Sequence, residues 1–183
     1  MDYETKPTSR KDLRRYAGIL RRLFGVPASG AFPVLEVLDK IPDVFEGSNY
    51  VIVEDKELPA KTMAQCTPNN AGGMTIEIKQ SVYEGAYKRN IGAFRGFICH
   101  ELCHLFLFSI GFTPIYARSF ADGEVPPYRS VEWQAKALCG EVMIPYAETR
   151  GMRVKAIQEN YQVSEAFAKH RSMLDRTERR NAH

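Results

Sequence analysis

The chain has 183 residues, of which 44% are apolar, 26% charged and 11% aromatic, with 13 glycines and 10 prolines. This length and composition are typical of one folded domain and exclude a disordered, collagen-like or disulfide-rich small protein. The net charge of +3 does not demand a nucleic-acid partner, because nonspecific DNA binding needs several cationic contacts on one face. We therefore expect a single domain over residues 1–183.

The first 15 residues are rich in charged and polar groups and contain no apolar stretch, so neither a secretory signal nor a transit peptide is expected. The most apolar run, residues 105–112, is far shorter than the roughly 20 residues that cross a bilayer. The cysteines lack the paired spacing of zinc fingers and predict reduced thiols; they are Cys66, Cys99, Cys103 and Cys139. These observations favour a cytoplasmic protein without membrane contact.

Helices are predicted first in the chain, over residues 9–42. Ser9 can cap a helix whose apolar residues recur every three or four positions, and Gly25 marks its end. A second, short helix is predicted after Pro33, and Pro42 is expected to end it.

A small antiparallel sheet is predicted over residues 49–80, because three β-rich runs occur there, at 50–53, 62–67 and 75–78. Asn90 is then expected to cap a helix over residues 91–110, which is apolar nearly all round and ends before Gly111. A helix of this kind is buried in the centre of a domain.

A long loop is predicted over residues 112–129, because prolines and turn-forming residues interrupt any periodicity there. Ser130 is a favourable cap for a helix over residues 130–144, which Pro145 ends. Further helices are predicted over residues 146–178, the last of them from Ser164.

The predicted central helix carries a metal-binding pattern, since residues 100–104 have the sequence His-Glu-Leu-Cys-His. Residues four apart on an α-helix are rotated by about 40°, so both imidazoles project from one face, one turn apart. This arrangement allows His100 and His104 to bind the same metal ion, with Glu101 beside them as a base.

The alternative is that both histidines are hydrogen-bonded core residues without a metal. Two of the four histidines of the chain and a glutamate would then lie in its most apolar helix. Such burial costs several kcal/mol unless each group has a partner. A bound cation supplies that partner, so we favour a metal site.

A catalytic zinc ion takes three protein ligands and keeps one position for water. The downstream candidates for the third ligand are Asp122, Glu124, Glu132 and Glu141. Glu132 is favoured because it falls in the first turn of a predicted helix, where Ala135, one turn later, permits close packing against the metal helix. Glu141 is half a turn out of phase with Glu132. The alternative for Glu132 is an interaction with the helix dipole alone.

Several motifs together resemble the ImmA/IrrE metallo-endopeptidases. Residues 100–104 resemble the HELGH motif of that family, and residues 132–145 resemble its E-x-E-A…FAAELLMP helix. Cys103 stands where the family usually has glycine, and Gln134 where it has glutamate. Within residues 12–172, further matches lie at 32–35, 75–78, 95–97 and 163–166.

The resemblance implies a zincin-like α+β fold, in which a small antiparallel sheet packs on the central metal helix and further helices lie at both ends. It also implies a zinc-dependent endopeptidase in which His100, His104 and Glu132 hold one Zn²⁺ ion and Glu101 is the general base. Family members cleave helix-turn-helix transcriptional repressors, often of prophages and mobile elements. A repressor is therefore the substrate that the resemblance implies.

The chemistry of such a site is peptide hydrolysis. Zinc lowers the pKa of a bound water to about 7, and Glu101 is placed to take the proton of that water and pass it to the leaving amine. A further donor is expected for the oxyanion, and the candidates are Tyr116, Tyr128 and Arg95. The strand over residues 75–78 could bind an extended substrate if it forms the edge of the sheet.

Three other functions are compatible with the sequence. One is a zinc-containing anti-repressor that binds its regulator without cutting it, although Glu101 argues against a purely structural site. Another is DNA binding by the basic segment 164–180, but its acidic residues dilute the charge, so direct nucleic-acid binding is not expected. The last is an iron(II) site for oxygen chemistry, which needs more open positions and a cosubstrate pocket.

Overall fold

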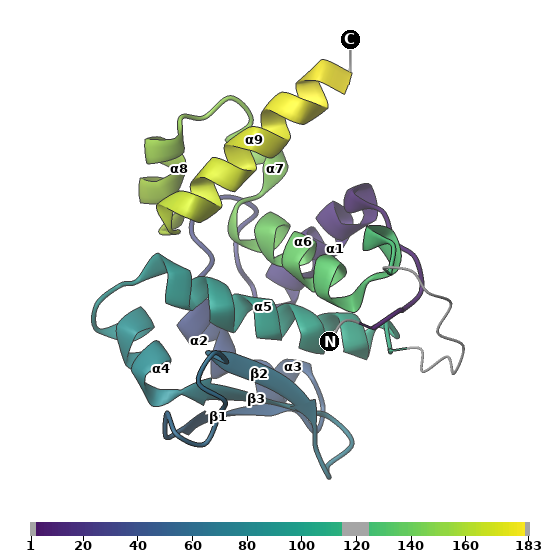
Figure 1. Ribbon diagram of the computed structural model, residues 1–183, viewed down its shortest axis with the longest axis vertical. Helices are drawn as coiled ribbons and strands as arrows, with labels where there is room; N and C mark the ends of the chain where they lie inside the picture. Colours follow the sequence, from purple (N-terminus) through teal and green to yellow (C-terminus); the bar gives the residue numbers. More distant parts are fainter. Residues whose placement is uncertain (1–2, 115–124, 182–183) are drawn as a thin grey trace.

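Residues 3–114 and 125–181 are described by the computed structural model, and their helices stack in layers above a small sheet (Figure 1). A long central helix crosses the sheet, a second layer of helices covers it, and the C-terminal helices lie furthest from the strands. This arrangement confirms an α+β fold. In chain order the elements are α1 (Arg10–Leu23), α2 (Val34–Leu38), α3 (Ile41–Val44), β1 (Asn49–Val53), β2 (Ala64–Pro68), β3 (Met74–Lys79), α4 (Gln80–Tyr87), α5 (Gly92–Ser109), the 3₁₀ helix η1 (Pro127–Arg129), α6 (Val131–Met143), α7 (Tyr146–Thr149), α8 (Val154–Tyr161) and α9 (Glu165–Asn181).

The sheet is mixed, and the prediction of an antiparallel sheet is wrong for one of its two strand pairs. The strand order is β1-β3-β2, with β3 parallel to β1 and antiparallel to β2. The chain leaves β1, crosses to the far edge to form β2, and returns through a tight turn into the middle. Asn69 shapes this turn, because its side-chain oxygen accepts hydrogen bonds from the amides of Ala71 and Gly73. As a result β3 runs in the same direction as β1.

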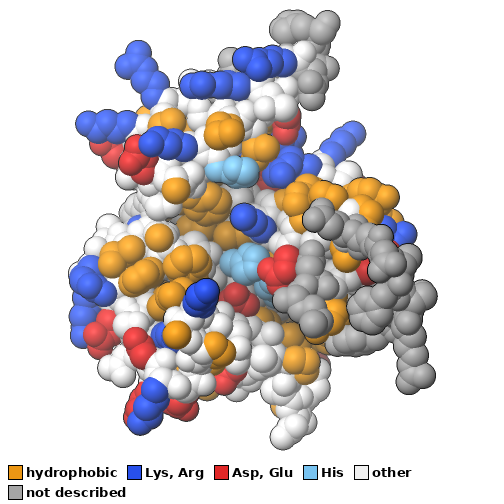
Figure 2. All heavy atoms as spheres, in the orientation of Figure 1, with side chains coloured by type: hydrophobic (Ala, Val, Ile, Leu, Met, Phe, Trp, Pro, Cys, Tyr) orange, Lys and Arg blue, Asp and Glu red, His pale blue; other side chains and the backbone are white. Residues whose placement is uncertain are grey.

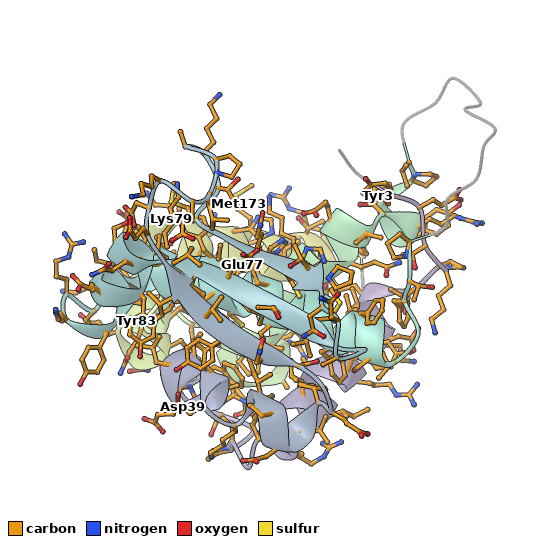
Figure 3. The ribbon with its side chains drawn as sticks, turned by 90° about the horizontal axis from the view of Figure 1, so that it is seen from below. Tyr3, Asp39, Glu77, Lys79, Tyr83 and Met173 are labelled. Atoms are coloured by element: carbon orange, nitrogen blue, oxygen red, sulfur yellow. The ribbon has the colours of Figure 1, made fainter. Side chains whose placement is uncertain are left out.

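The core extends from the sheet, through α5, to the helices on its other side. Ile76 and Ile78 on β3 and Leu102 on α5 are fully buried. Helix α5 is covered by the sheet on one side and by α6 on the other, which explains its nearly uniform apolar composition. Figure 3 views the sheet from its other face, where Glu77 on β3 accepts a hydrogen bond from the Gln65 side chain on β2 at 2.7 Å.

Helix α1 begins and ends as predicted. The Ser9 side chain accepts a hydrogen bond from the amide of Asp12 at 3.1 Å, and Gly25 follows the helix with a φ of +68°. The second predicted helix is in fact two, because α2 ends at Leu38 and Pro42 lies in the first turn of α3. Proline is favourable there, since the amides of a first turn have no partner within the helix.

The start of α5 differs from the prediction. Ile91, and not Asn90, is the residue before the helix, and Asn90 has a left-handed backbone with a φ of +54°. The Asn90 side chain instead accepts a hydrogen bond from Arg95. Helix α4, which directly precedes this junction, was not predicted. No single helix among the described residues has the length and apolar character to cross a membrane; α4 and α5 reach that composition only together, and they are bent by 119° where they meet.

Helix α6 also begins where the sequence predicts, because the Ser130 side chain accepts a hydrogen bond from the amide of Trp133 at 2.8 Å. Of the predicted loop over 112–129, residues 115–124 lie outside the described residues, and its end forms η1. The predicted helices after Pro145 are confirmed as α7, α8 and α9.

Candidate metal centre

His100 and His104 project from the same side of α5. Their Nε2 atoms lie 3.0 Å apart, and their ring centroids are separated by 4.6 Å with the rings nearly perpendicular. Their side chains are 23% and 16% exposed, so both are partly buried and still reached by solvent. Figure 2 shows histidine side chains beside acidic groups near the middle of this face of the molecule.

Glu132 meets both histidines from the first turn of α6. Its Oε2 atom lies 3.4 Å from Nε2 of His100, and its Oε1 atom lies 3.4 Å from Nε2 of His104. One ligand atom of each of the three side chains lies within 4.8 Å of the other two. Two imidazoles and one carboxylate form a donor set that fits zinc, and the partly exposed Glu132 leaves one side of the group open to solvent.

The position of Glu132 depends on the segment that precedes α1. This segment pairs with the start of α6, since the amide of Thr5 donates to the carbonyl of Arg129 at 2.7 Å and the amide of Val131 donates to that of Tyr3 at 2.9 Å. The buried amide of Gln134 adds hydrogen bonds to two further backbone carbonyls, those of Lys6 and Tyr128. A glutamate at this position would lack these donors when ionised, which explains glutamine here.

Close packing of α6 on α5 brings the third ligand candidate to the histidines. Ala135, one turn after Glu132, is fully buried, and so is Leu138. The expectation that a small residue permits close approach at this point therefore agrees with the structure. Both helices are anchored in the core on the side away from solvent, so the three donor groups are held by rigid elements.

Glu101 faces the sheet on the other side of the histidines. The backbone amide of Cys66 on β2 acts on its carboxylate and favours the ionised form. Burial raises the pKa of Glu101, and the negative charge of Glu132 acts in the same direction, against the opposing effect of the two histidines. A carboxylate with a raised pKa is a stronger base at neutral pH.

The other charges of the cluster support a cation-binding role for Glu132. Its hydrogen bonds with His100 and His104 hold the pKa of Glu132 far below its usual value, so the carboxylate is ionised. Burial alone would lower the pKa of His100, but the hydrogen bond with Glu132 and the charge of Glu101 outweigh it and raise this pKa. The cluster therefore concentrates negative charge at the two imidazoles.

Among the remaining candidates for the third ligand, Glu141 is the one that lies within the described residues. Asp122 and Glu124 lie outside the described residues. Glu141 is 2% exposed and binds the guanidinium of Arg171 on α9, with a distance of 2.6 Å between Oε2 and Nη2. Glu132 and Glu141 differ in phase by half a turn. The carboxylate of Glu132 therefore lies at the surface, and that of Glu141 is buried and structural.

Only some of the candidates for the oxyanion donor can be located. Tyr116 lies outside the described residues. Arg95 is 7% exposed, and its guanidinium donates to the side chain of Asn90 and to the carbonyl of Gln162, so it joins the start of α5 to the end of α8. Tyr128 lies on η1, next to the start of α6, and is 52% exposed.

The strand predicted to bind substrate is not at the edge of the sheet. Residues 75–78 belong to β3, which is the central strand, so both of its sides are already paired. Both β2 and β3 pack against α5, and within the described residues β2 pairs with β3 alone. A free edge beside the metal helix is therefore offered by β2.

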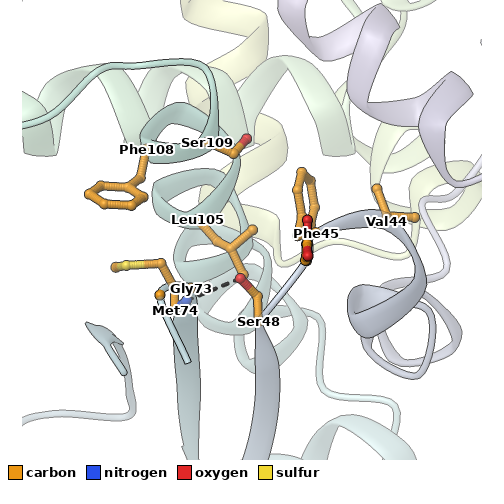
Figure 4. A pocket seen from close by; sticks show the side chains of 10 residues that line it. Val44, Phe45, Ser48, Gly73, Met74, Leu105, Phe108 and Ser109 are labelled. Atoms are coloured by element: carbon orange, nitrogen blue, oxygen red, sulfur yellow. Dashed lines mark hydrogen bonds between the residues drawn. The ribbon is translucent and has the colours of Figure 1, made fainter. Parts of the chain in front are cut away.

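A pocket of about 460 Å³ lies away from this cluster, at the end of α5 (Figure 4). Leu105 and Phe108 of α5 line one side of it, and Phe45 and Ser48 line another. The Ser48 hydroxyl accepts a hydrogen bond from the amide of Met74 at 3.0 Å, so it is engaged in joining the strands. None of the metal-site residues lines this pocket.

Two features in and around the metal site were missed by the sequence analysis. The backbone amide of Cys66 that acts on Glu101 has no side-chain signal, so only the tertiary structure could show it. The second feature is a group of three thiols, Cys99, Cys103 and Cys139, whose Sγ atoms lie within 4.8 Å of one another. The spacing of four residues between Cys99 and Cys103, which equals that of the histidines, was a signal that could have found it.

Comparison with known proteins adds information on the fold. No protein-family model and no curated protein matches the sequence. The fold is similar to that of a solved structure, a Mycobacterium tuberculosis transcriptional regulator, with a TM-score of 0.53 and 16% sequence identity. The similarity covers 88% of this chain and 46% of that chain, so the present chain spans less than half of the regulator. At this identity the likeness concerns the fold alone.

Proposed function

We propose that the protein is a zinc-dependent endopeptidase. The observation that carries this proposal is the convergence of His100, His104 and Glu132 from two helices, with Glu101 held beside them. A site that only stabilises the fold would be closed by a fourth protein ligand. Here one side of the donor group is exposed to solvent, and a carboxylate with a raised pKa lies next to it.

The residues divide into ligands and a base. His100, His104 and Glu132 would hold the cation, which supplies a Lewis acid and lowers the pKa of water to about 7. Glu101 takes a proton from the attacking water at its carboxylate and delivers it to the leaving amine. The backbone amide of Cys66 on β2 favours the ionised form of this carboxylate, which supports its role as the base.

The proposed substrate is a protein segment in an extended conformation. Within the described residues β2 is an edge strand packed against α5, and backbone hydrogen bonds along such an edge orient an added strand. The resemblance to ImmA/IrrE endopeptidases supports a helix-turn-helix repressor as the protein that is cut. This substrate rests on the sequence motifs, and the same motifs leave a non-catalytic anti-repressor as the competing function.

Variants of one proposed ligand and of the proposed base test the proposal. We expect Glu101→Gln to bind as much zinc as wild type does, because Glu101 is not a ligand, and His104→Ala to bind one equivalent less. Metal content is measured by elemental analysis after dialysis against a weak chelator. Zinc retained in full by His104→Ala, or lost from Glu101→Gln, would contradict the assigned roles.

The catalytic part is tested in cells that express wild type or Glu101→Gln at equal levels. Protein N-termini are compared by mass spectrometry, and we expect new termini in cells that express wild type. Their abundance should be at least about 100-fold lower with Glu101→Gln, which is the lower range for loss of a general base. Equal fragments with both variants would rule out hydrolysis by this site. If the Glu101→Gln variant still relieves repression while no protein is cut, the anti-repressor is the correct function.

A further inference from the structure

A second group of metal-binding side chains lies in the interface between α5 and α6. The Sγ atoms of Cys99, Cys103 and Cys139 all lie within 4.8 Å of one another, and none of these residues is more than 4% exposed. Cys99 and Cys103 are one turn apart on α5, and Cys139 reaches them from α6. Three sulfur donors therefore converge at a place that is closed to solvent.

This group is separate from the histidine site, although both are built on α5. Cys99 and Cys103 each precede a histidine by one residue, so they are rotated by about 100° around the helix, toward α6. Glu101 is rotated by the same amount in the opposite direction and faces β2. The histidine face lies between these two sides, and the thiols take no part in the hydrolysis proposed for it.

The spacing of the thiols suits one cation bound by three sulfurs. With a metal–sulfur distance of about 2.3 Å, three ligands in a trigonal plane lie about 4 Å from one another. The Sγ atoms all lie within 4.8 Å of one another, which is compatible with this value. A disulfide would need sulfurs about 2.05 Å apart, and all four cysteines of the chain are free thiols.

A buried positive charge acts electrostatically on one of the thiols. Arg21 is 2% exposed and donates hydrogen bonds to four backbone carbonyls, those of Pro27, Ser29, Gly30 and Val142. Among the described residues no carboxylate forms an ion pair with Arg21, and its charge interacts with Cys99. A charge in a protein interior is unfavourable without compensation. Three thiolates around a divalent cation carry one net negative charge, which the guanidinium balances.

We propose that Cys99, Cys103 and Cys139 form a second metal site, which binds one thiophilic divalent cation. Thiolate sulfur is the ligand that such cations prefer over imidazole and carboxylate. On binding, each thiol releases its proton to solvent and each sulfur forms one bond to the cation. An occupied site joins α5 to α6 beside the face that carries His100 and His104. It thereby stabilises the packing that brings Glu132 to these histidines.

Cadmium is the probe for this site, because thiolate-to-cadmium charge transfer absorbs in the ultraviolet and imidazole or carboxylate ligands do not produce it. Reduced, metal-free protein is titrated with Cd²⁺ under anaerobic conditions. We expect absorption that saturates with the intensity of three Cd–S bonds per chain, together with a rise in Tm. The histidine site does not contribute to this absorption, and the measurement needs no substrate.

Single cysteine variants identify the ligands. We expect Cys139→Ala and Cys103→Ala to weaken the sulfur-bound cadmium by more than the roughly 10- to 100-fold that loss of a supporting residue costs. Cys66→Ala is the matched control, because Cys66 lies on β2 outside the group, and it should bind as wild type does. Wild-type protein without thiolate absorption, or Cys139→Ala with undiminished absorption, would overturn the site.

Circular dichroism detects variants that fold poorly. In that case alkylation of the wild-type cysteines tests the proposal without any variant. Protein with and without Cd²⁺ is exposed to a thiol reagent in mild denaturant, and the modified peptides are counted by mass spectrometry. We expect cadmium to slow the modification of Cys99, Cys103 and Cys139 and to leave Cys66 unchanged. Equal protection of all four cysteines, or of none, would refute the proposal.

Discussion

Single buried charges decide the stability of the helical part of the molecule. The carboxylate of Glu141 contacts guanidinium groups from two helices, with Arg171 of α9 at 2.6 Å and Arg14 of α1 at 3.3 Å. Arg171 is 4% exposed and also donates to the carbonyl of Ile144. Because Glu141 and Arg171 are both removed from water, each charge depends on the other.

We expect Glu141→Gln to lower the free energy of unfolding by about 3–5 kcal/mol, since it leaves Arg171 buried without a countercharge. Glu159→Gln is the matched control: its carboxylate is 64% exposed and faces Lys155 at 3.9 Å, so we expect a change within about 0.5 kcal/mol. Urea denaturation measures both. Equal effects of the two substitutions would show that the buried pair contributes nothing specific.

At the scale of elements, helix starts determine where the functional side chains lie. Ser9 and Ser130 cap α1 and α6 in the same way, each accepting a hydrogen bond from the amide three residues later. Only the second cap lies close to the metal site, because Glu132 follows it by two residues. Comparing substitutions of the two serines therefore distinguishes the effect of a cap on stability from its effect on the position of the metal ligand Glu132.

We expect Ser9→Ala and Ser130→Ala each to lower the free energy of unfolding by about 1 kcal/mol. Only Ser130→Ala should also weaken zinc binding, because fraying of the first turn of α6 allows Glu132 to move away from the histidines. Zinc affinity is measured by competition with a chromophoric chelator. Should both variants bind zinc equally well, the cap has no part in positioning the ligand.

Across the whole molecule, the C-terminal helix is held to the N-terminal one by charges. Glu178 on α9 pairs with Arg14 on α1, and the carboxylate of Asp175 accepts a hydrogen bond from the amide of Gly151 at 3.0 Å. Burial alone would raise the pKa of Glu178, but the hydrogen bonds from Arg14 and Tyr146 outweigh it and hold this pKa below 4.5. The ionised form of Glu178 is thus favoured by folding.

A pH dependence of stability follows from this shift. A carboxylate whose pKa is lower in the folded state stabilises the fold fully above its unfolded pKa, and this contribution is lost as the pH falls through the folded pKa. Below pH 4.5 we therefore expect the free energy of unfolding to fall more steeply for wild type than for Glu178→Gln. Chelator-treated protein is used, with Glu54→Gln, an exposed carboxylate, as the control. Parallel pH profiles for wild type and Glu178→Gln would contradict the assigned role of the pair.

Local signals in the sequence determined several features that the structure shares. The caps Ser9 and Ser130 act on amides three residues away, and the spacing of His100 and His104 places both on one face of any helix. These properties depend on neighbours in the chain, so periodicity and capping chemistry predict them without knowledge of the fold. Helix α4 escaped prediction because it follows β3 without a break and spans only Gln80–Tyr87.

Contacts between distant segments were decided only by the tertiary structure. Whether β3 runs parallel or antiparallel to a neighbour depends on which strand lies beside it. The residues of β3 do not distinguish a parallel neighbour from an antiparallel one. The sequence favoured Glu132 among several acidic candidates, but only the packing of α6 on α5 showed that it lies 3.4 Å from both histidines. Packing also set Glu141 against Arg171 and gathered three thiols, because long-range contacts depend on how helix faces meet, and local residue patterns leave that choice open.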